Sequence, residues 1–255
     1  MELRPFRAIR FSPAIIARQG LETLIAPAYP EGPPAAEGTG ATENAARLIA
    51  PEPPAAAETF RQWLAAGTLW KERRPGMWLH RQTLGTRTPA VIRLLVGLVR
   101  VDGAGAVGAV ELPTQETGPE ARDRRLARLR EIKADFEPAL ILTRAPLTAA
   151  LATTRRPDHS VLDAEGVRHD LLRITDYAEH VELQGLVKNA EATLVTGGED
   201  WEAGRELAKD AVAAKMPGAR YKLCAIAEES AVAGLERPPR LYAGFFGFSV
   251  EDPVY

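Results

Sequence analysis

Residues 93–101, Arg-Leu-Leu-Val-Gly-Leu-Val-Arg-Val, form the almost unbroken apolar run that decides the class of fold. Such a run is typical of a strand that is covered on both faces. Outward from it, the patterning predicts further strands over residues 4–11, 77–83, 107–112, 139–143, 167–174, 192–196, 221–227 and 241–250. Apolar residues at helical spacing predict helices over 58–66, 119–133, 177–189 and 201–215. The sequence therefore predicts an α/β fold of mixed α+β type, with a mixed sheet flanked by three or four helices.

A stretch rich in proline, glycine and alanine covers residues 26–57 and carries proline clusters at 30–34 and 51–54. Because proline fixes φ and lacks an N–H group, we expect a long irregular N-terminal arm there. The 255 residues suffice for a single domain over 1–255. A division into subdomains 1–150 and 158–255, joined by a linker rich in Thr, Arg and Pro, is the alternative.

The composition excludes several classes of protein. Apolar residues make up 45% and charged residues 26% of the chain, which is ordinary for globular proteins. A net charge of -2 gives no basic excess for a nucleic-acid backbone, so nucleic acid is not expected as a partner. The single cysteine, Cys224, cannot form an internal disulfide, and no apolar run is long enough to span a membrane. The first residues do not resemble a signal peptide, so we expect a soluble, cytoplasmic protein and leave a homodimer open.

The clearest candidate for a binding site is the segment 192–201, in which a strand passes through two glycines into a helix. Amide groups at the start of a helix can hold a phosphate or a carboxylate, and glycine lets the backbone approach a ligand closely. The candidate ligand-binding residues are Thr196, Gly197, Gly198, Glu199 and Asp200. A plain connector is the alternative, because acids are common in the first turn of a helix and compete with a bound anion.

Two further side chains are candidates for acid-base chemistry. Strand alternation places His169 on the face of Val167 and Leu171, as a hydrogen-bonded, partly buried histidine or as a catalytic base. Glu116 lies in the loop before the helix at 119–133, where it either faces water or acts as a base. Five arginines of that helix are expected to form a solvated face: Arg122, Arg124, Arg125, Arg128 and Arg130.

Other familiar chemistries lack sequence support. The histidines have no spacing that forms a metal site with Cys224 or nearby acids, and Cys224 itself is expected to be a buried, inert thiol. The sequence contains no Gly-x-Ser-x-Gly elbow, no Walker-type phosphate loop and no Gly-x-Gly-x-x-Gly motif that opens a helix after a strand. No cofactor can be named from the sequence.

Several segments, in order along nearly the whole chain, resemble the bacterial and archaeal domain-of-unknown-function family 1015. They are residues 3–10 (LRPFRAIR), 25–30 (IAPAYP), 60–69 (FRQWLAAGTL), 123–126 (DRRL), 136–139 (FEPA), 166–171 (GVRHDL) and 237–240 (RPPR). The last resembles a Pro-Thr-His-Arg segment of the family and makes Arg240 a candidate site residue. Arg168, in the matching segment 166–171, is a further candidate neighbour of the ligand.

The most distinctive motif of that family, Asp-Gly-His-His-Arg, corresponds here to residues 196–200 (TGGED). Only a glycine is retained, and Asp200 stands in the place of the arginine. The motif is similar to the phosphate-binding turn of the partition-protein/sulfiredoxin superfamily, which implies nucleotide or phosphate binding and, for an enzyme, nucleotide-dependent phosphotransfer or hydrolysis. The family's His-Glu pair corresponds to Gln115 and Glu116, of which only the carboxylate is kept.

Two hypotheses follow from the sequence. In the first, the protein binds a phosphate-bearing small molecule or nucleotide at a degenerate turn around Gly197, with Glu116 and His169 as catalytic candidates and Arg168 and Arg240 nearby. In the second, a noncatalytic relative keeps the fold and acts through protein contacts or as an accessory subunit.

Overall fold

The computed structural model describes residues 1–29, 43–50, 52–85, 89–102, 119–210, 216–235 and 239–254. Three of the sequence predictions fall outside these ranges: the strand at 107–112, the candidate base Glu116, and the end of the helix expected at 201–215.

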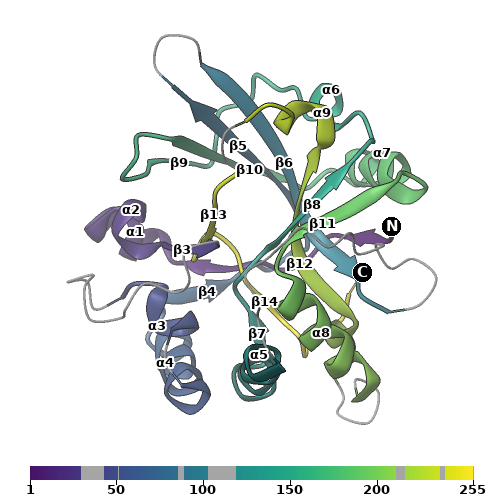
Figure 1. Cartoon of the computed structure of the whole chain (residues 1–255). Helices are drawn as coiled ribbons and strands as arrows, with labels where there is room; N and C mark the ends of the chain where they lie inside the picture. Colours follow the sequence, from purple (N-terminus) through teal and green to yellow (C-terminus); the bar gives the residue numbers. More distant parts are fainter. Residues whose placement is uncertain are drawn as a thin grey trace.

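The described residues form one eight-stranded mixed sheet with helices around it (Figure 1). The strand order is β11-β8-β12-β6-β5-β10-β9, and β1 also pairs with β6. Only β8 and β12 run parallel, while the other pairs are antiparallel. The bounds are β1 Leu3–Arg4, β5 Met77–Leu84, β6 Ala90–Arg100, β8 Ala139–Thr143, β9 His159–Leu162, β10 Arg168–Ile174, β11 Ala192–Thr196 and β12 Tyr221–Glu228. The predicted fold class is confirmed.

Strand β6 is buried on both faces, as its apolar run predicts. Leu94, Val96 and Leu98 pack in one hydrophobic cluster, and Leu95 and Val99 pack in another on the opposite face. Each fully buried aliphatic side chain contributes about 1.5–3 kcal/mol. The two clusters therefore hold the helices and the C-terminal segment against the two faces of the sheet.

The structure has helices at three of the positions that the sequence predicts. Helix α5 spans Pro119–Ile132, α7 spans Tyr177–Lys188 and α8 spans Gly198–Asp210. Helix α8 begins three residues earlier than its apolar pattern indicated, immediately after Gly197. In Figure 1, α4 (Pro53–Ala65), α5 and α8 lie at the same end of the molecule, and α5 contacts the other two.

The remaining described elements are short. They are α1 Pro13–Gln19, α2 Leu21–Leu24, α6 Leu147–Ala150, α9 Glu229–Val232, the 3-10 helix Pro217–Arg220, and the strand pairs β2 Ile9–Phe11 with β4 Leu69–Lys71, β3 Ala26–Tyr29 with β13 Leu241–Ala243, and β7 Ala134–Asp135 with β14 Phe248–Ser249. The strand expected over 241–250 is thus divided into β13 and β14. A turn at Gly244, whose φ is 95°, separates them.

Parts of the segment at 26–57 are regular. Besides β3, it contains α3 (Ala46–Ile49), and α4 begins at Pro53, five residues before the helix expected from Glu58. Two prolines are tolerated there because the first turn of a helix has no intrahelical partner for its N–H groups. Among the described residues, no helix is long and apolar enough to cross a membrane. The division into subdomains stays a prediction, and the sheet draws strands from both sides of residue 150.

Gly247 allows the C-terminal segment to pack closely on the ring of Phe136. A Cβ atom at position 247 would lie 2.4 Å from two carbons of that ring. We expect Gly247→Ala to lower the free energy of unfolding by about 1–3 kcal/mol, measured by urea denaturation. Gly185→Ala is the matched control, because Gly185 lies within α7 with open space around it and should gain up to about 1 kcal/mol. Equal stability of Gly247→Ala and the wild type would contradict this packing.

Candidate functional site

The turn between β11 and α8 has the geometry of an anion-binding helix start. Gly197 has a φ of 81°, a conformation that other residues adopt only at a cost of about 1–2 kcal/mol. Trp201 donates its amide to the carbonyl of Gly197 at 2.9 Å, which closes the first turn. The N–H groups of Gly198, Glu199 and Asp200 have no acceptor within the part of the chain that the structure describes.

The start of α8 differs in exposure from one residue to the next. Gly198 is exposed, Glu199 is half-buried and Asp200 is buried. Thr196 is held by the sheet, because its hydroxyl accepts the amide of Leu140 at 3.2 Å. Access from solvent is therefore through Gly198, while the side chain of Asp200 points into the protein.

Asp200 places a buried carboxylate at the turn. One carboxylate oxygen lies 3.4 Å from Nε of Arg125, and the other, Oδ2, has no hydrogen-bond partner among the described residues. Burial raises the pKa of Asp200 to about 6, while the charge of Lys222 acts in the opposite direction. The carboxylate is therefore negative at pH 7 but becomes neutral in mildly acidic solution.

The arginines of α5 do not form one solvated face, and this part of the prediction is wrong. Arg125 and Arg128 point inward, and both form ion pairs with the buried Glu137. They lie four residues before the buried Leu129 and Ile132, on the apolar side of the helix. Arg122, Arg124 and Arg130 are exposed.

A second buried ion pair adjoins this group. Nζ of Lys222 lies 2.9 and 2.8 Å from the two carboxylate oxygens of Asp135, and it also donates to the carbonyl of Glu137. Burial alone would lower the pKa of Lys222, but the charge of Asp135 outweighs burial and raises it, so Lys222 stays protonated at neutral pH. Three cations and three carboxylates thus gather between β7, β12, α5 and α8.

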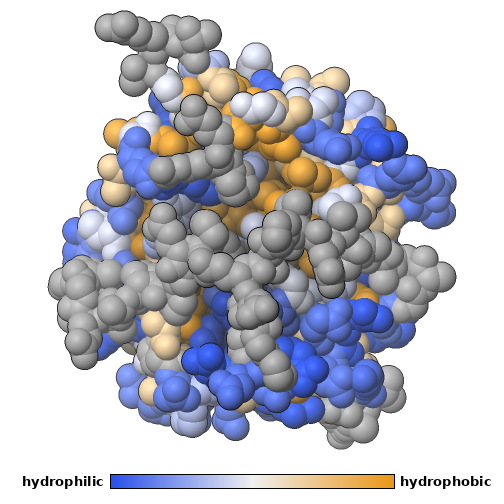
Figure 2. All heavy atoms as spheres, viewed as in Figure 1, coloured by the Kyte–Doolittle hydropathy of each residue, from blue (hydrophilic) through white to orange (hydrophobic). Residues whose placement is uncertain are grey.

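These charges border a hollow of about 270 Å³, which includes its opening to solvent. Its inner part has room for about one water molecule. Residues of α3, α5, β7 and α8 form the walls: Leu48, Ile49, Arg125, Arg128, Leu129, Ile132, Ala134, Asp135, Phe136, Glu137 and Asp200. Figure 2 shows hydrophilic side chains gathered at the end of the molecule where α5 and α8 lie in Figure 1.

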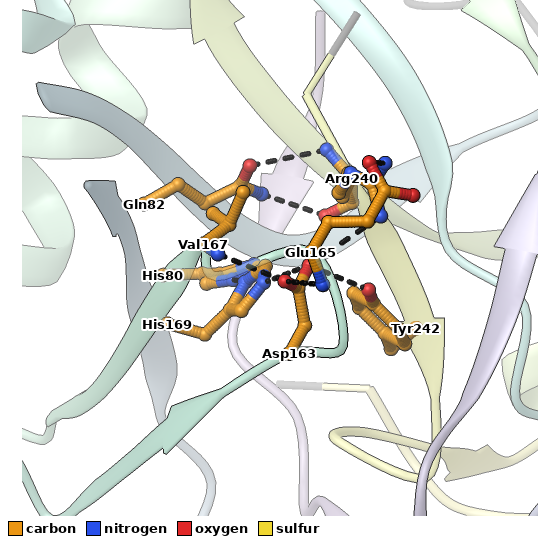
Figure 3. A network of polar contacts seen from close by, with 8 residues as sticks. All are labelled: His80, Gln82, Asp163, Glu165, Val167, His169, Arg240 and Tyr242. Carbon is orange, nitrogen blue, oxygen red and sulfur yellow. Dashed lines mark hydrogen bonds and ion pairs between the residues drawn. The ribbon is translucent and has the colours of Figure 1, made fainter. Parts of the chain in front are cut away.

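His169 belongs to a different polar network, drawn in Figure 3. It is fully buried, with Nε2 3.2 Å from Asp163 and Nδ1 2.9 Å from Nε2 of His80. Because a carboxylate only accepts, His169 donates to Asp163 and accepts from His80. The hydroxyl of Tyr242 donates to the same oxygen of Asp163 at 2.8 Å, and Arg240 lies 3.5 Å from it.

The network holds its histidines neutral. Burial lowers the pKa of His169 and lowers that of His80 well below its usual value. Burial also raises the pKa of Tyr242 to about 12, together with its hydrogen bond to Asp163. The arrangement clamps β5, β10 and the C-terminal segment together, since Gln82 exchanges two hydrogen bonds with the backbone of Arg240.

The structure separates the predicted site residues into two groups. Residues 196–200 lie at the β11–α8 turn, whereas His169, Arg168 and Arg240 lie around β10. Four strands of the sheet separate β11 from β10, so the second group does not contribute to the turn. Arg168 is exposed and pairs with Asp170 at 3.0 Å. Glu116 lies outside the described residues.

Several polar residues of these clusters were not expected from the sequence. Lys222 could have been found, because a lysine within the apolar run at 221–227 indicates a buried partner. The inward direction of Arg125 could have been found from its spacing to Leu129. His80 and Tyr242 lie far along the chain from His169, and no local signal connects them.

Other chemistries have no site in the described ranges. There, no group of three or more His, Cys, Asp and Glu side chains is arranged to hold a metal ion. Cys224 is fully buried, and burial raises the pKa of its thiol, so it is not a nucleophile at neutral pH.

Comparison with known families gives a match over most of the chain. The family model described as "Protein of unknown function (DUF1015)" matches residues 3–208. No curated protein matches the chain significantly, and no solved structure does so either.

Because of the two buried histidines, we expect the protein to become less stable as the pH falls. An unfolded histidine has a pKa of about 6.5, and burial lowers the pKa of both His80 and His169 in the folded state. Below pH 6.5 the unfolded chain therefore binds more protons than the folded one. Each histidine then lowers the free energy of unfolding by up to about 1.4 kcal/mol for every pH unit of acidification. We expect His80→Gln to reduce this loss between pH 7.5 and 5, measured by urea denaturation. An unchanged pH dependence in that variant would contradict the neutral pair.

Proposed function

The chain belongs to the DUF1015 family, whose function is unknown, and we propose that it binds a small phosphate-bearing molecule at the β11–α8 turn. The observation that carries this proposal is the set of three amides at Gly198, Glu199 and Asp200 without an acceptor among the described residues. A phosphate oxygen at the start of a helix gains both hydrogen bonds and the favourable field of the helix dipole.

The two inward arginines support the same site. Arg125 lies beside Asp200, and the guanidinium groups of Arg125 and Arg128 share the carboxylate of Glu137. A phosphate at the turn would compete with Asp200 for Arg125 and would meet a positive group as well as amides.

Comparison with the family motif adds a role for Arg125. Asp200 stands where the related turns carry an arginine, which reverses the charge beside the ligand. In our proposal Arg125 of α5 supplies from a neighbouring helix the guanidinium group that the motif lacks. The likeness to the phosphate-binding turn of the partition-protein/sulfiredoxin superfamily is an analogy that agrees with this reading.

Catalysis is a separate question from binding. Among the described residues, no histidine lies at the turn, since four strands lie between β11 and the strand of His169. Glu116 remains the candidate base, and a nucleotide-dependent phosphotransfer or hydrolysis would need it to approach the turn. The geometry supports binding more directly than it supports a reaction.

A second candidate function rests on the ion pairs themselves. Arg125 and Arg128 are already neutralised by Glu137 and Asp200, so the site could be a closed structural cluster. The protein would then be a noncatalytic relative that acts through contacts with other proteins. Binding measurements on the purified chain separate the two candidates.

We expect inorganic phosphate and ATP to bind the wild-type chain at millimolar or lower concentration, measured by isothermal titration calorimetry. Arg125→Met should weaken phosphate binding about tenfold or more, because a charge-assisted hydrogen bond contributes about 1.5–3 kcal/mol. Arg122→Met, on the exposed side of the same helix, is the matched control and should bind as the wild type does. Absence of binding of both ligands would favour the structural candidate.

Neutralising Asp200 should strengthen anion binding. We expect Asp200→Asn to bind sulfate about tenfold more tightly at pH 7.5, because a buried charge acts in a low dielectric. Glu199→Gln removes the same charge from a half-buried side chain and should gain less.

The same carboxylate predicts how binding depends on pH. Asp200 becomes neutral as the pH falls through about 6, so wild-type affinity for sulfate should rise over that range. The charged groups around it are Arg125 and Arg128 on α5, Asp135 on β7, Glu137 after β7 and Lys222 on β12, with Glu199 on its own helix. Asp200→Asn should show a flatter pH profile, and an equal rise in both proteins would contradict the role of Asp200.

A further inference from the structure

A buried carboxylate oxygen at the hollow has no hydrogen-bond donor within the described part of the protein. Oδ2 of Asp200 makes no hydrogen bond there, although the residue is only 5% exposed. A buried carboxylate oxygen without a donor costs about 1–3 kcal/mol or more. Asp200 also lines the hollow, so a group that enters the hollow can reach this oxygen.

The size of the hollow restricts that group. Its inner part has room for about one water molecule. A carboxylate accepts hydrogen bonds and cannot donate them, so the entering group must be a donor of similar size. Hydroxyl and ammonium groups meet both conditions.

The surrounding charges favour the hydroxyl. Arg125, Arg128 and Lys222 already supply three positive charges to the three carboxylates of the cluster. An ammonium group would add a fourth positive charge and would lose its hydration on entering a small hollow, which is costly. A hydroxyl group donates one hydrogen bond and leaves the balance of charge unchanged.

The hydroxyl group and the phosphate of such a ligand would bind to the same turn of α8. Asp200 is the third residue of the helix, and its own amide is one of the three that carry the proposed anion site. The amides and the carboxylate belong to one turn of the helix, so a ligand that meets both must carry its two groups within a few bonds of each other. We infer that the ligand of this site is a hydroxylated phosphate ester, whose phosphate binds the amides of α8 and whose hydroxyl donates to Oδ2 of Asp200. This inference rests on the proposed function and names the class of ligand for it.

The test compares two esters that differ in their hydroxyl groups. Glycerol 3-phosphate and n-propyl phosphate have the same phosphate and the same number of carbons. We expect the full-length chain to bind glycerol 3-phosphate about tenfold or more tightly than n-propyl phosphate by isothermal titration calorimetry, because a hydrogen bond to a charged group is strong. Inorganic phosphate serves as the reference for the anion site alone.

Variants locate the preference. Asp200→Ala should bind both esters with equal affinity, while Glu202→Ala, the matched control at an exposed acid of the same helix, should keep the wild-type ratio. Thermal unfolding of both variants checks that they fold, and the comparison on the wild type does not depend on either of them.

The outcomes distinguish the inference from the function on which it rests. Equal affinity of the wild type for the two esters, with inorganic phosphate still bound, overturns the inference and leaves the proposed function intact. A preference for glycerol 3-phosphate that persists in Asp200→Ala also overturns the inference. If none of the three phosphates binds, the proposed function fails as well.

Discussion

The buried ion pair between Lys222 and Asp135 is the interaction on which the candidate site depends. Lys222 is 2% exposed and lies on β12, next to the central strand β6, while Asp135 ends the short strand β7. Removing one partner of such a pair costs about 3–5 kcal/mol, because the other charge is left buried. The pair therefore fixes β7 against the sheet, and with it the position of Glu137 and the arginines of α5 that Glu137 holds.

The charges at this end of the molecule explain both proposed functions with the same residues. Each arginine has a carboxylate partner, which makes the cluster stable without a ligand. Two buried polar atoms at the hollow nevertheless have no hydrogen-bond partner among the described residues: the second carboxylate oxygen of Asp200, whose pKa burial raises to about 6, and Nε of Arg128. An unpartnered acceptor beside an unpartnered donor suits a ligand that brings a donor and an anion together.

The histidine network has a different character from the turn. Its members satisfy one another, with Asp163 accepting from Tyr242, His169 and two backbone amides. Satisfied buried networks make a structure rigid and specify one arrangement. We therefore assign His169 a structural part in joining β10 to the C-terminal segment, and its burial agrees with the hydrogen-bonded alternative that the sequence left open.

The sequence alone determined the class of fold and most of the longer elements, because their signals are local, whereas short elements such as β7 and β9 were not predicted. The apolar run around Val96 marked the central strand, and the strands at 139–143 and 192–196 have the bounds that their patterns predict. The pair of glycines between that strand and the following helix was likewise visible in the sequence, whereas the left-handed conformation of Gly197 is known only from the structure. Only the tertiary structure decided which charges meet. The partners of Lys222, Asp200 and His169 come from segments far along the chain. Contacts between distant segments produce no local pattern in a single sequence, so they could not be predicted from it.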